Sequence, residues 1–174
     1  MCGILAAVKP RYNRTRLNKM LLIMKHRGPD FQGDLLLNSQ VYLGHNRLSI
    51  LDLNPRSNQP LKIGDDIIIF NGEIYNYLEL KENLISNKVN LTTNSDTEIL
   101  LQYYKIYKEK CVDYFEGMWS FAIYNIAKQK LFLSRDRFAE KPLYFFQNAN
   151  GIFFASEIKY LSSLTNKNFS PNIN

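Results

Sequence analysis

The sequence predicts a single α+β domain in which two antiparallel sheets stack, with helices outside them. Helix-type stretches are grouped separately from strand-type runs, which favours α+β over a parallel, doubly wound sheet. The strand-type runs follow one another at close intervals through short turn-rich segments, as antiparallel strands do. The repeated "FF" and "III" runs indicate strands buried on both faces. At 174 residues and 45% hydrophobic content, the chain is long enough for one substantial core.

The first expected helix covers residues 15–25. Its large apolar residues recur at the spacing i, i+3, i+4, i+7 and therefore share one helical face: Leu17, Met20, Leu21 and Met24. Gly28 and Pro29 end this helix. Three strand-type runs follow, at 34–37, 41–51 and 66–70. The turn-rich segments "NSQ" and "IGDD" between them predict hairpin connections.

Two more helices are expected at 77–86 and 96–109, and the second begins with "SDTE" at 95–98, which matches a capping box. Four apolar runs then predict another antiparallel meander, at 118–125, 130–134, 142–146 and 151–156. A final short helix is expected from Glu157 to Leu164. The polar segment 165–174 has the composition of a linker, so we expect the domain to span 1–164.

Composition and charge exclude several classes of protein. The net charge of +6 comes from 22 scattered Lys and Arg residues, which does not favour nucleic-acid binding. Cys2 and Cys111 have the spacing of neither a disulfide framework nor a zinc site, so we expect no metal and a reducing, cytoplasmic location. No apolar run approaches the roughly 18 residues of a membrane span, and no signal region precedes Cys2.

Cys2 is the first candidate for chemistry. If Met1 is removed, a new α-amino group lies on the same residue as the thiol. The reference pKa of such an amine is about 7.7 to 8.0 and that of a thiol about 8.5, so the amine can take the thiol proton near neutral pH. One residue would then supply both nucleophile and base. The alternative is a buried, inert cysteine in a first strand.

Five other residues carry functional groups that also have ordinary explanations. Asn71 and Gly72 come where the third strand-type run ends, so their amide donors can point into a cleft, although Asn-Gly is also a common turn. Arg47 suits two-pronged binding of a carboxylate, or it is solvated. Asp96 lies in the first turn of a helix, where the helix dipole favours an acid. Glu73 belongs to a site or is a surface acid.

In this order, the motifs of the chain resemble the glutaminase domain of class II glutamine amidotransferases, the N-terminal nucleophile (Ntn) hydrolases. The matching segments cover nearly the whole chain: "MCGI" at 1–4, "HRGPD" at 26–30, "GHNRLSILD" at 44–52, "NQP" at 58–60, "NGEIYN" at 71–76, "SDTE" at 95–98, "GMWSFAIYN" at 117–125, "RDRF" at 135–138, "KPLY" at 141–144 and "FASEIKYL" at 154–161. Within the class, "HRGPD", "RDRF…KPLY" and "SEIK" are most similar to the glutamine-hydrolysing asparagine synthetase branch.

The resemblance implies a four-layer αββα fold and a glutaminase activity. Cys2 would be the nucleophile and its α-amine the general base. The side chain of Asn71 and the backbone N–H of Gly72 would form the oxyanion hole. The thiolate would attack the side-chain amide of glutamine, ammonia would leave, and water would then cleave the thioester to release glutamate.

The resemblance also implies how glutamine is held. Arg47 would hold the α-carboxylate, and Glu73 and Asp96 would receive the α-ammonium group. Backbone groups of the strand at Leu48 and Ile50 would help to seat the substrate. Neither a metal nor an organic cofactor is implied for this half-reaction. ATP and magnesium are expected only for a synthetase domain, which this sequence does not contain.

Two departures from the family pattern matter. Ala139 stands where the family usually has glycine, and if that position holds a positive φ, alanine costs about 1 to 2 kcal/mol or the turn is rebuilt. The other departure is length, because the chain ends before any ammonia-accepting domain. We therefore expect a synthetase domain or subunit as partner. Two alternatives stay open: supply of ammonia to a sugar amidotransferase of surface polysaccharide synthesis, and a catalytically idle binding or partner module.

Overall fold

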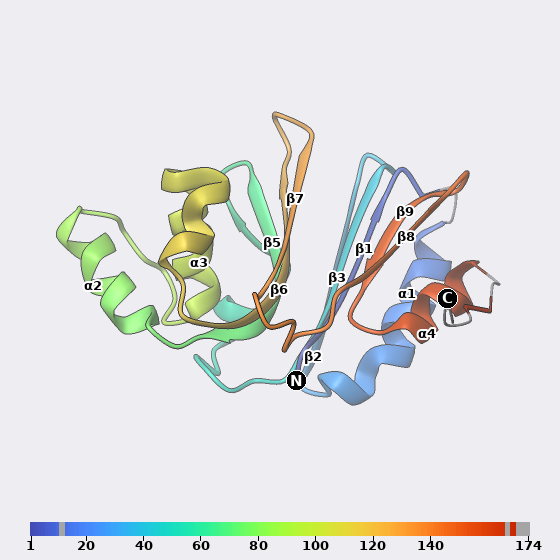
Figure 1. Cartoon of the computed structure of the whole chain (residues 1–174), viewed down its shortest axis with the longest axis horizontal. Coiled ribbons are helices and arrows are strands. Elements are labelled where there is room, and N and C mark those ends of the chain that lie inside the picture. Colours follow the sequence, from blue (N-terminus) through green and yellow to red (C-terminus); the bar gives the residue numbers. More distant parts are fainter. Residues whose placement is uncertain (11–12, 166–167, 170–174) are drawn as a thin grey trace.

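Two antiparallel sheets face each other in the middle of the molecule, and each carries helices on its outer side (Figure 1). The computed structural model describes residues 1–10, 13–165 and 168–169. Helices α1 (Arg14–Ile23) and α4 (Ile158–Thr165) cover one sheet, and α2 (Tyr77–Ser86) and α3 (Asp96–Tyr107) lie on the side of the other. The predicted α+β class and the four-layer αββα arrangement are confirmed.

The first sheet has five strands in the order β2-β3-β1-β9-β8. Their bounds are Gly3–Val8 (β1), Phe31–Leu37 (β2), Val41–Arg47 (β3), Tyr144–Asn148 (β8) and Gly151–Ala155 (β9). The central strand β1 pairs with β3 on one edge and with β9 on the other, so the N-terminal strand is held by segments from both ends of the chain. The predicted "NSQ" hairpin joins β2 to β3.

The second sheet has four strands in the order β4-β5-β6-β7. Their bounds are Leu61–Ile63 (β4), Asp66–Ile74 (β5), Gly117–Asn125 (β6) and Lys130–Arg135 (β7). Short 3₁₀ turns lie at Met24–Arg27 (η1), Pro55–Ser57 (η2) and Lys108–Tyr114 (η3). The long pairing of β5 with β6 runs from Asp66 to Ile74 and forms the middle of this sheet.

Buried side chains form separate layers on the two faces of each sheet, as the "III" and "FF" runs predicted. Along β5, Ile67 and Ile69 belong to the layer between the sheets, whereas Ile68 and Phe70 pack towards α3. Along β1, Ile4 and Ala6 face the other sheet, and the alternate residues pack against α1. This period of two is that of an extended strand, and it fixes which later residues of each strand face the inter-sheet layer.

Several predicted strand ends are shifted, among them the start of β2 and both ends of β8, and two that are wrong lie near the candidate residues. The run 41–51 leaves the sheet after Arg47, because the backbone of Leu48 turns to contact Cys2 and Arg47 binds carbonyl groups of the following loop. The strand expected at 66–70 continues through Asn71 and Gly72 to Ile74. Its pairing with β6 extends over this Asn-Gly step, so the step is neither a turn nor the end of a strand.

The two predicted meanders are also corrected, because consecutive strands change sheets. "IGDD" joins β5 to the short strand β4, which was not among the predicted strands, and not to β3. The last four strands divide between the sheets, with β6 and β7 in one and β8 and β9 in the other. The chain crosses after β7 because the hairpin of β8 and β9 covers the second edge of β1.

The predicted helices are confirmed with small shifts of their ends. The first helix continues as η1, and α3 ends at Tyr107, where Lys108 takes a φ of +54°. Most of the segment 165–174, predicted to be a linker, lies outside the described residues. Within the part of the chain that the structure describes, no helix is long and apolar enough to cross a membrane.

Candidate active site

A cavity of about 180 Å³ lies at one end of the two sheets, where both contribute side chains. Its lining includes every predicted site residue: Cys2, Arg47, Leu48, Ile50, Asn71, Gly72, Glu73 and Asp96. The strand period explains part of this arrangement. Asn71 has the same parity as Ile67 and Ile69, so it extends the layer between the sheets, and Cys2 extends the Ile4 and Ala6 series in the same way. The apolar layer between the sheets therefore ends in a polar cavity.

Cys2 is held at the N-terminal end of β1 by two distant segments. Its Sγ lies 3.4 Å from the backbone N of Leu48, which donates to it, and 3.7 Å from the carbonyl oxygen of the same residue. The carbonyl of Cys2 accepts from Nε of Arg27 at 2.9 Å. Arg27 in turn pairs with Glu157 at 2.9 Å, just before α4. The sulfur is thus fixed beside the loop that follows β3.

The environment of the thiol favours its protonated form. Burial raises the pKa of Cys2, and the hydrogen bond with Leu48, the N-terminal ammonium group and the Arg47 cation oppose that effect only in part. A base is therefore needed to generate the thiolate near neutral pH. Cys111 lies apart from the cavity, is fully buried, and has a pKa raised to about 12 by burial.

Asn71 offers an amide donor that is not otherwise used. The residue is buried, and its Nδ2 has no hydrogen-bond partner among the described residues. Since an unpaired buried donor costs free energy, such a group in a cavity wall is suited to a bound acceptor. The neighbouring Gly72 pairs with Trp119, and a Cβ at Gly72 would overlap the carbonyl oxygen of Met118. Only glycine fits this approach of β5 to β6.

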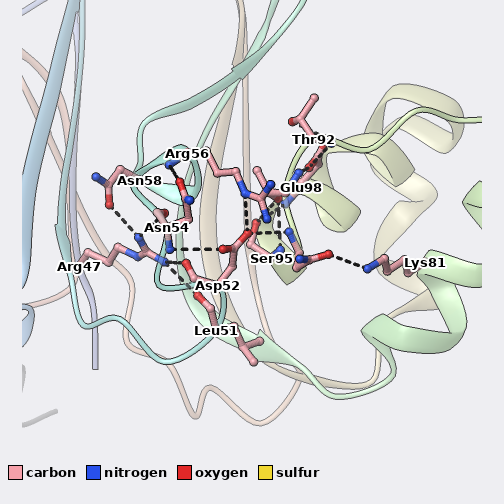
Figure 2. A network of polar contacts seen from close by, with 12 residues as sticks. Arg47, Leu51, Asp52, Asn54, Arg56, Asn58, Lys81, Thr92, Ser95 and Glu98 are labelled. Atoms are coloured by element: carbon pink, nitrogen blue, oxygen red, sulfur yellow. Dashed lines mark hydrogen bonds and ion pairs between the residues drawn. The ribbon is translucent and has the colours of Figure 1, made fainter.

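Arg47 is buried, so the solvated alternative for this residue is wrong. Figure 2 shows its guanidinium inside the loop that follows β3. Nη2 donates to the carbonyls of Leu51 at 3.0 Å and Asp52 at 2.5 Å, and Nη1 donates to Oδ1 of Asn58 at 2.8 Å and to the carbonyl of Asn54 at 3.4 Å. The terminal nitrogens of the guanidinium thus bind the loop, and the arginine shapes the cavity wall as well as supplying a positive charge.

Asp96 is the first residue of α3 and is buried in the cavity wall. Its Oδ2 accepts from the backbone N of Ile74 at 3.1 Å, which joins α3 to the end of β5. Burial raises the pKa of Asp96 to about 6, and the nearby charge of Glu73 acts in the same direction. A carboxyl group of this kind gains from a bound cation, because the cation offsets the cost of its buried charge.

The capping box predicted at the start of α3 forms only in part. Ser95 is the N-cap, and its Oγ accepts from the backbone N of Glu98 at 3.3 Å. The Glu98 carboxylate does not return to Ser95; it accepts from the backbone N–H groups of Thr92 and Thr93 at 2.5 to 3.1 Å. Glu98 therefore orders the segment that leads into the helix.

Three residues of the site were present in the quoted motifs without an assigned role. Arg27 binds the carbonyl of Cys2, as described above. Gln59 accepts from the backbone N of Phe70 at 2.6 Å and donates to Thr97 at 3.1 Å, so it ties β5 to α3. Lys141 is buried in the cavity wall, and its Nζ lies 3.2 Å from Sδ of Met1. No sequence signal beyond their place in the motifs points to these three residues, because their contacts are made with residues that are distant in the sequence.

The turn that leads to Lys141 contains Ala139, which takes a φ of +59°. The family glycine position thus holds a positive φ here, and alanine adopts it. Within the described ranges, no group of three or more His, Cys, Asp or Glu side chains is placed to hold a metal ion. The cavity contains a thiol, an unused amide donor, a buried cation and two acids.

Comparisons with known proteins show the family of the chain. The chain matches the family model described as "Glutamine amidotransferase domain" over residues 1–174. It is 43% identical to asparagine synthetase (glutamine-hydrolysing) 1 of Bacillus subtilis over 84% of this chain and 23% of that protein. It is 38% identical to asparagine synthetase (glutamine-hydrolysing) 3 of Arabidopsis thaliana over 93% of this chain and 28% of that protein.

A solved structure shows the same fold. The glutamine phosphoribosylpyrophosphate amidotransferase of B. subtilis, in complex with ADP and GMP, matches with a TM-score of 0.83 and 17% identity, over 94% of this chain and 44% of that one. The αββα sandwich is thus also the fold of that amidotransferase. The chain spans between 23% and 37% of the length of the first curated relatives that it matches. The family match, the shared fold and the cavity together show that the chain belongs to the glutamine amidotransferase domain family.

Proposed function

We propose that this chain hydrolyses glutamine to glutamate and ammonia, as the glutaminase domain of a glutamine-hydrolysing asparagine synthetase. The observation that carries the proposal is a single cavity lined by Cys2, Asn71 and the buried Arg47 and Asp96. Nδ2 of Asn71 has no hydrogen-bond partner among the described residues. The names of the relatives support the synthetase assignment. We propose that the domain covers 1–164 and that the following segment leads towards a synthetase domain.

The nucleophile in this proposal is the thiolate of Cys2. Removal of Met1 exposes an α-amine on Cys2, and this amine accepts the thiol proton, directly or through a water molecule. A base on the same residue suits this site, because burial raises the pKa of the thiol and keeps it protonated at neutral pH. The sulfur then forms a bond to the amide carbon of glutamine.

Attack moves an electron pair onto the amide oxygen, and donors are needed to stabilise it. We propose that Nδ2–H of Asn71 and the backbone N–H of Gly72 provide them; removal of one such donor typically lowers the rate by about 10²- to 10³-fold. The electron pair then returns to re-form the carbonyl, the C–N bond breaks, and the α-ammonium group of Cys2 gives its proton to the departing nitrogen, which leaves as ammonia. Water cleaves the thioester, which releases glutamate and regenerates the thiol.

The α-amino acid head of glutamine is a zwitterion, and the cavity offers matching charges. We propose that the α-carboxylate binds beside Arg47, with backbone groups at Leu48 and Ile50 helping to seat it. The α-ammonium group would bind Asp96 and Glu73, where the buried Asp96 gains from a positive partner. This half-reaction uses the chain's own groups and water. ATP and magnesium would be needed only in the ammonia-accepting domain.

The direct test is glutamate release from glutamine by the purified protein and by its Cys2→Ala variant. We expect steady release by the first and none above the uncatalysed rate by the second. Intact mass gives an independent check, since the proposed base exists only if Met1 has been removed. Equal activity of the two proteins, or full activity with Met1 retained, would contradict the mechanism.

The two alternatives predict other outcomes. If the chain is an idle binding module, the wild-type protein would bind glutamine but would not hydrolyse it. A glutaminase for a sugar amidotransferase would show the same hydrolysis but a different partner, because the acceptor is chosen by another domain or subunit. Co-purification of the acceptor protein from the native host would distinguish that case. Both cysteines are free thiols, which supports a reducing, cytoplasmic setting for the reaction.

A further inference from the structure

Asp52 lies in the loop between β3 and β4, outside the predicted set of site residues, and takes an unusual backbone conformation. Its φ is +42°, in the left-handed region that favours glycine, asparagine and aspartate. Its side chain is only 6% exposed. An observed backbone strain of this kind, next to a binding site, indicates that the surroundings hold the residue in place.

Figure 2 shows Asp52 between Arg47 and the segment of Ser95, and its two ends bind these two separate segments of the chain. Its carbonyl oxygen accepts from Nη2 of Arg47 at 2.5 Å. Its carboxylate accepts from the backbone N of Asn94 at 2.7 Å and from Nε of Arg56 at 3.2 Å. The hydrogen bond from Asn94 and the other donors lower the pKa of the Asp52 carboxyl to about 2. The group is therefore ionised at neutral and at mildly acidic pH.

The segment 92–94, which Asp52 binds through Asn94, is held by further hydrogen bonds and leads directly to Asp96. Glu98 binds the backbone of Thr92 and Thr93, and Lys81 donates to Oδ1 of Asn94 at 2.9 Å. Asn94 lies two residues before Asp96. A continuous chain of contacts therefore runs from the guanidinium of Arg47 through Asp52 and Asn94 to the start of α3.

We propose that Asp52 is a positioning residue that fixes the spacing between Arg47 and Asp96, and so selects substrates that carry both an α-carboxylate and an α-ammonium group. The proposal rests on the glutaminase function proposed above. Asp52 does not line the cavity, so it acts through the other two residues. A cation and an anion at a fixed distance recognise a zwitterion better than either recognises a single charge, because both pairings then form without reorganisation.

Two variants separate the side chain from the backbone conformation. Asp52→Asn keeps the left-handed preference and one acceptor oxygen for the N–H of Asn94. Asp52→Gly keeps the backbone freedom but removes the acceptor. The matched control is Arg56→Ala, which removes the half-exposed ion-pair partner and leaves the contact with Asn94. Thermal unfolding of each variant checks that it is folded.

The experiment measures kcat and KM for glutamine and for its analogue without the α-amino group, the monoamide of glutaric acid. For Asp52→Gly we expect the KM of glutamine to rise about 10- to 100-fold, as for loss of a charge-assisted hydrogen bond, with kcat within about 3-fold. The preference for glutamine over the analogue should shrink by a similar factor. Asp52→Asn and Arg56→Ala should stay within about 3-fold of wild type.

The outcomes distinguish this proposal from the function on which it rests. A wild-type chain that releases no glutamate contradicts the glutaminase function, and calorimetric binding of glutamine to the Cys2→Ala chain with and without Asp52→Gly then tests Asp52 alone. An active wild type with an unchanged KM, or an unchanged preference, in a folded Asp52→Gly variant would overturn the role of Asp52. A loss confined to kcat would overturn it as well.

Discussion

The two cysteines differ in the properties that control thiol reactivity. Cys2 lines the cavity and is partly exposed. Cys111 is fully buried in the hydrophobic core that the second sheet forms with α3. Burial raises the pKa of both thiols, that of Cys111 to about 12. Access and thiolate character both decide the rate of alkylation, so these residues should react very differently.

We predict that iodoacetamide modifies the folded protein at Cys2 alone. Cys111 should react only after unfolding in denaturant, which supplies the internal control. Saturating glutamine should slow the reaction of Cys2, because the proposed site places the substrate against its sulfur. Peptide mass spectrometry after timed labelling measures both rates. Labelling of Cys111 in the folded protein at a rate similar to that of Cys2 would contradict the packing described for it.

At the scale of elements, the turn between β7 and β8 carries a residue that strains it. Ala139 takes a φ of +59°, and the turn is held by its N–H, which bonds to the carbonyl of Asp136, and by Arg135, which donates to the carbonyl of Ala139 at 2.8 Å. Alanine in this region costs about 1 to 2 kcal/mol relative to glycine. The hydrogen bonds of the turn therefore hold an unfavourable conformation.

We predict that Ala139→Gly increases the free energy of unfolding by roughly 0.5 to 1 kcal/mol, the relief of strain less the larger chain entropy of glycine. The control is Ala127→Gly, at an exposed alanine in the turn between β6 and β7 that does not have a positive φ. That change should be neutral or destabilising. Urea unfolding midpoints compare the two variants. An Ala139→Gly protein less stable than wild type would show that the turn gains from the alanine methyl group.

The helices could be predicted from local sequence, but the ends of the strands could not. The periodic apolar residues of α1 and the Ser95 cap of α3 act within one or two helical turns, so the sequence pattern contains them. The extension of β5 over Asn71 and Gly72 depends on β6, more than forty residues away. The departure of the chain after Arg47 depends on contacts with Cys2 and with loop carbonyls.

The candidate site shows the same division. The resemblance named the eight residues that the fold brings to one cavity, because the motifs are recognisable without any structure. The hydrogen bonds between Arg47 and its own loop, and the buried position of Lys141, have no local signature. They follow from the way in which the loops after β3 and β7 close over the ends of the sheets.

At the scale of the whole molecule, the layer between the sheets contains an ionisable group whose effect on the pH dependence of stability is opposite to that of Asp96. His45 on β3 is fully buried, and its Nε2 lies 3.1 Å from the carbonyl of Phe70 on β5, so a hydrogen bond crosses from one sheet to the other. Burial lowers the pKa of His45 to about 3. Burial raises the pKa of Asp96 to about 6. Both groups prefer to be neutral when folded, but acid affects them in opposite directions.

The sign of each contribution follows from linkage between proton binding and folding. The folded pKa of His45 is below its unfolded value of 6.5, so its contribution to stability is present above pH 6.5 and is lost as the pH falls towards 3. The folded pKa of Asp96 is above its unfolded value of 3.8, so its contribution is largest below pH 3.8 and is lost as the pH rises through 6. Between about pH 4 and 6 each slope is about 1.4 kcal/mol per pH unit, and the two cancel.

We therefore predict that the contributions of His45 and Asp96 to the pH dependence of the unfolding free energy cancel in the ligand-free protein, and that each single variant, compared with wild type, reveals the slope of the other group. Asp96→Asn should lose about 1.4 kcal/mol per pH unit as the pH falls, whereas His45→Gln should gain by a similar amount. Urea unfolding at several pH values measures both slopes. The control is Asp65→Asn, which changes an exposed acid in the turn between β4 and β5. Two variants with the same slope as wild type would mean that neither group is held neutral, and that the layer between the sheets admits water as far as β3 and β5.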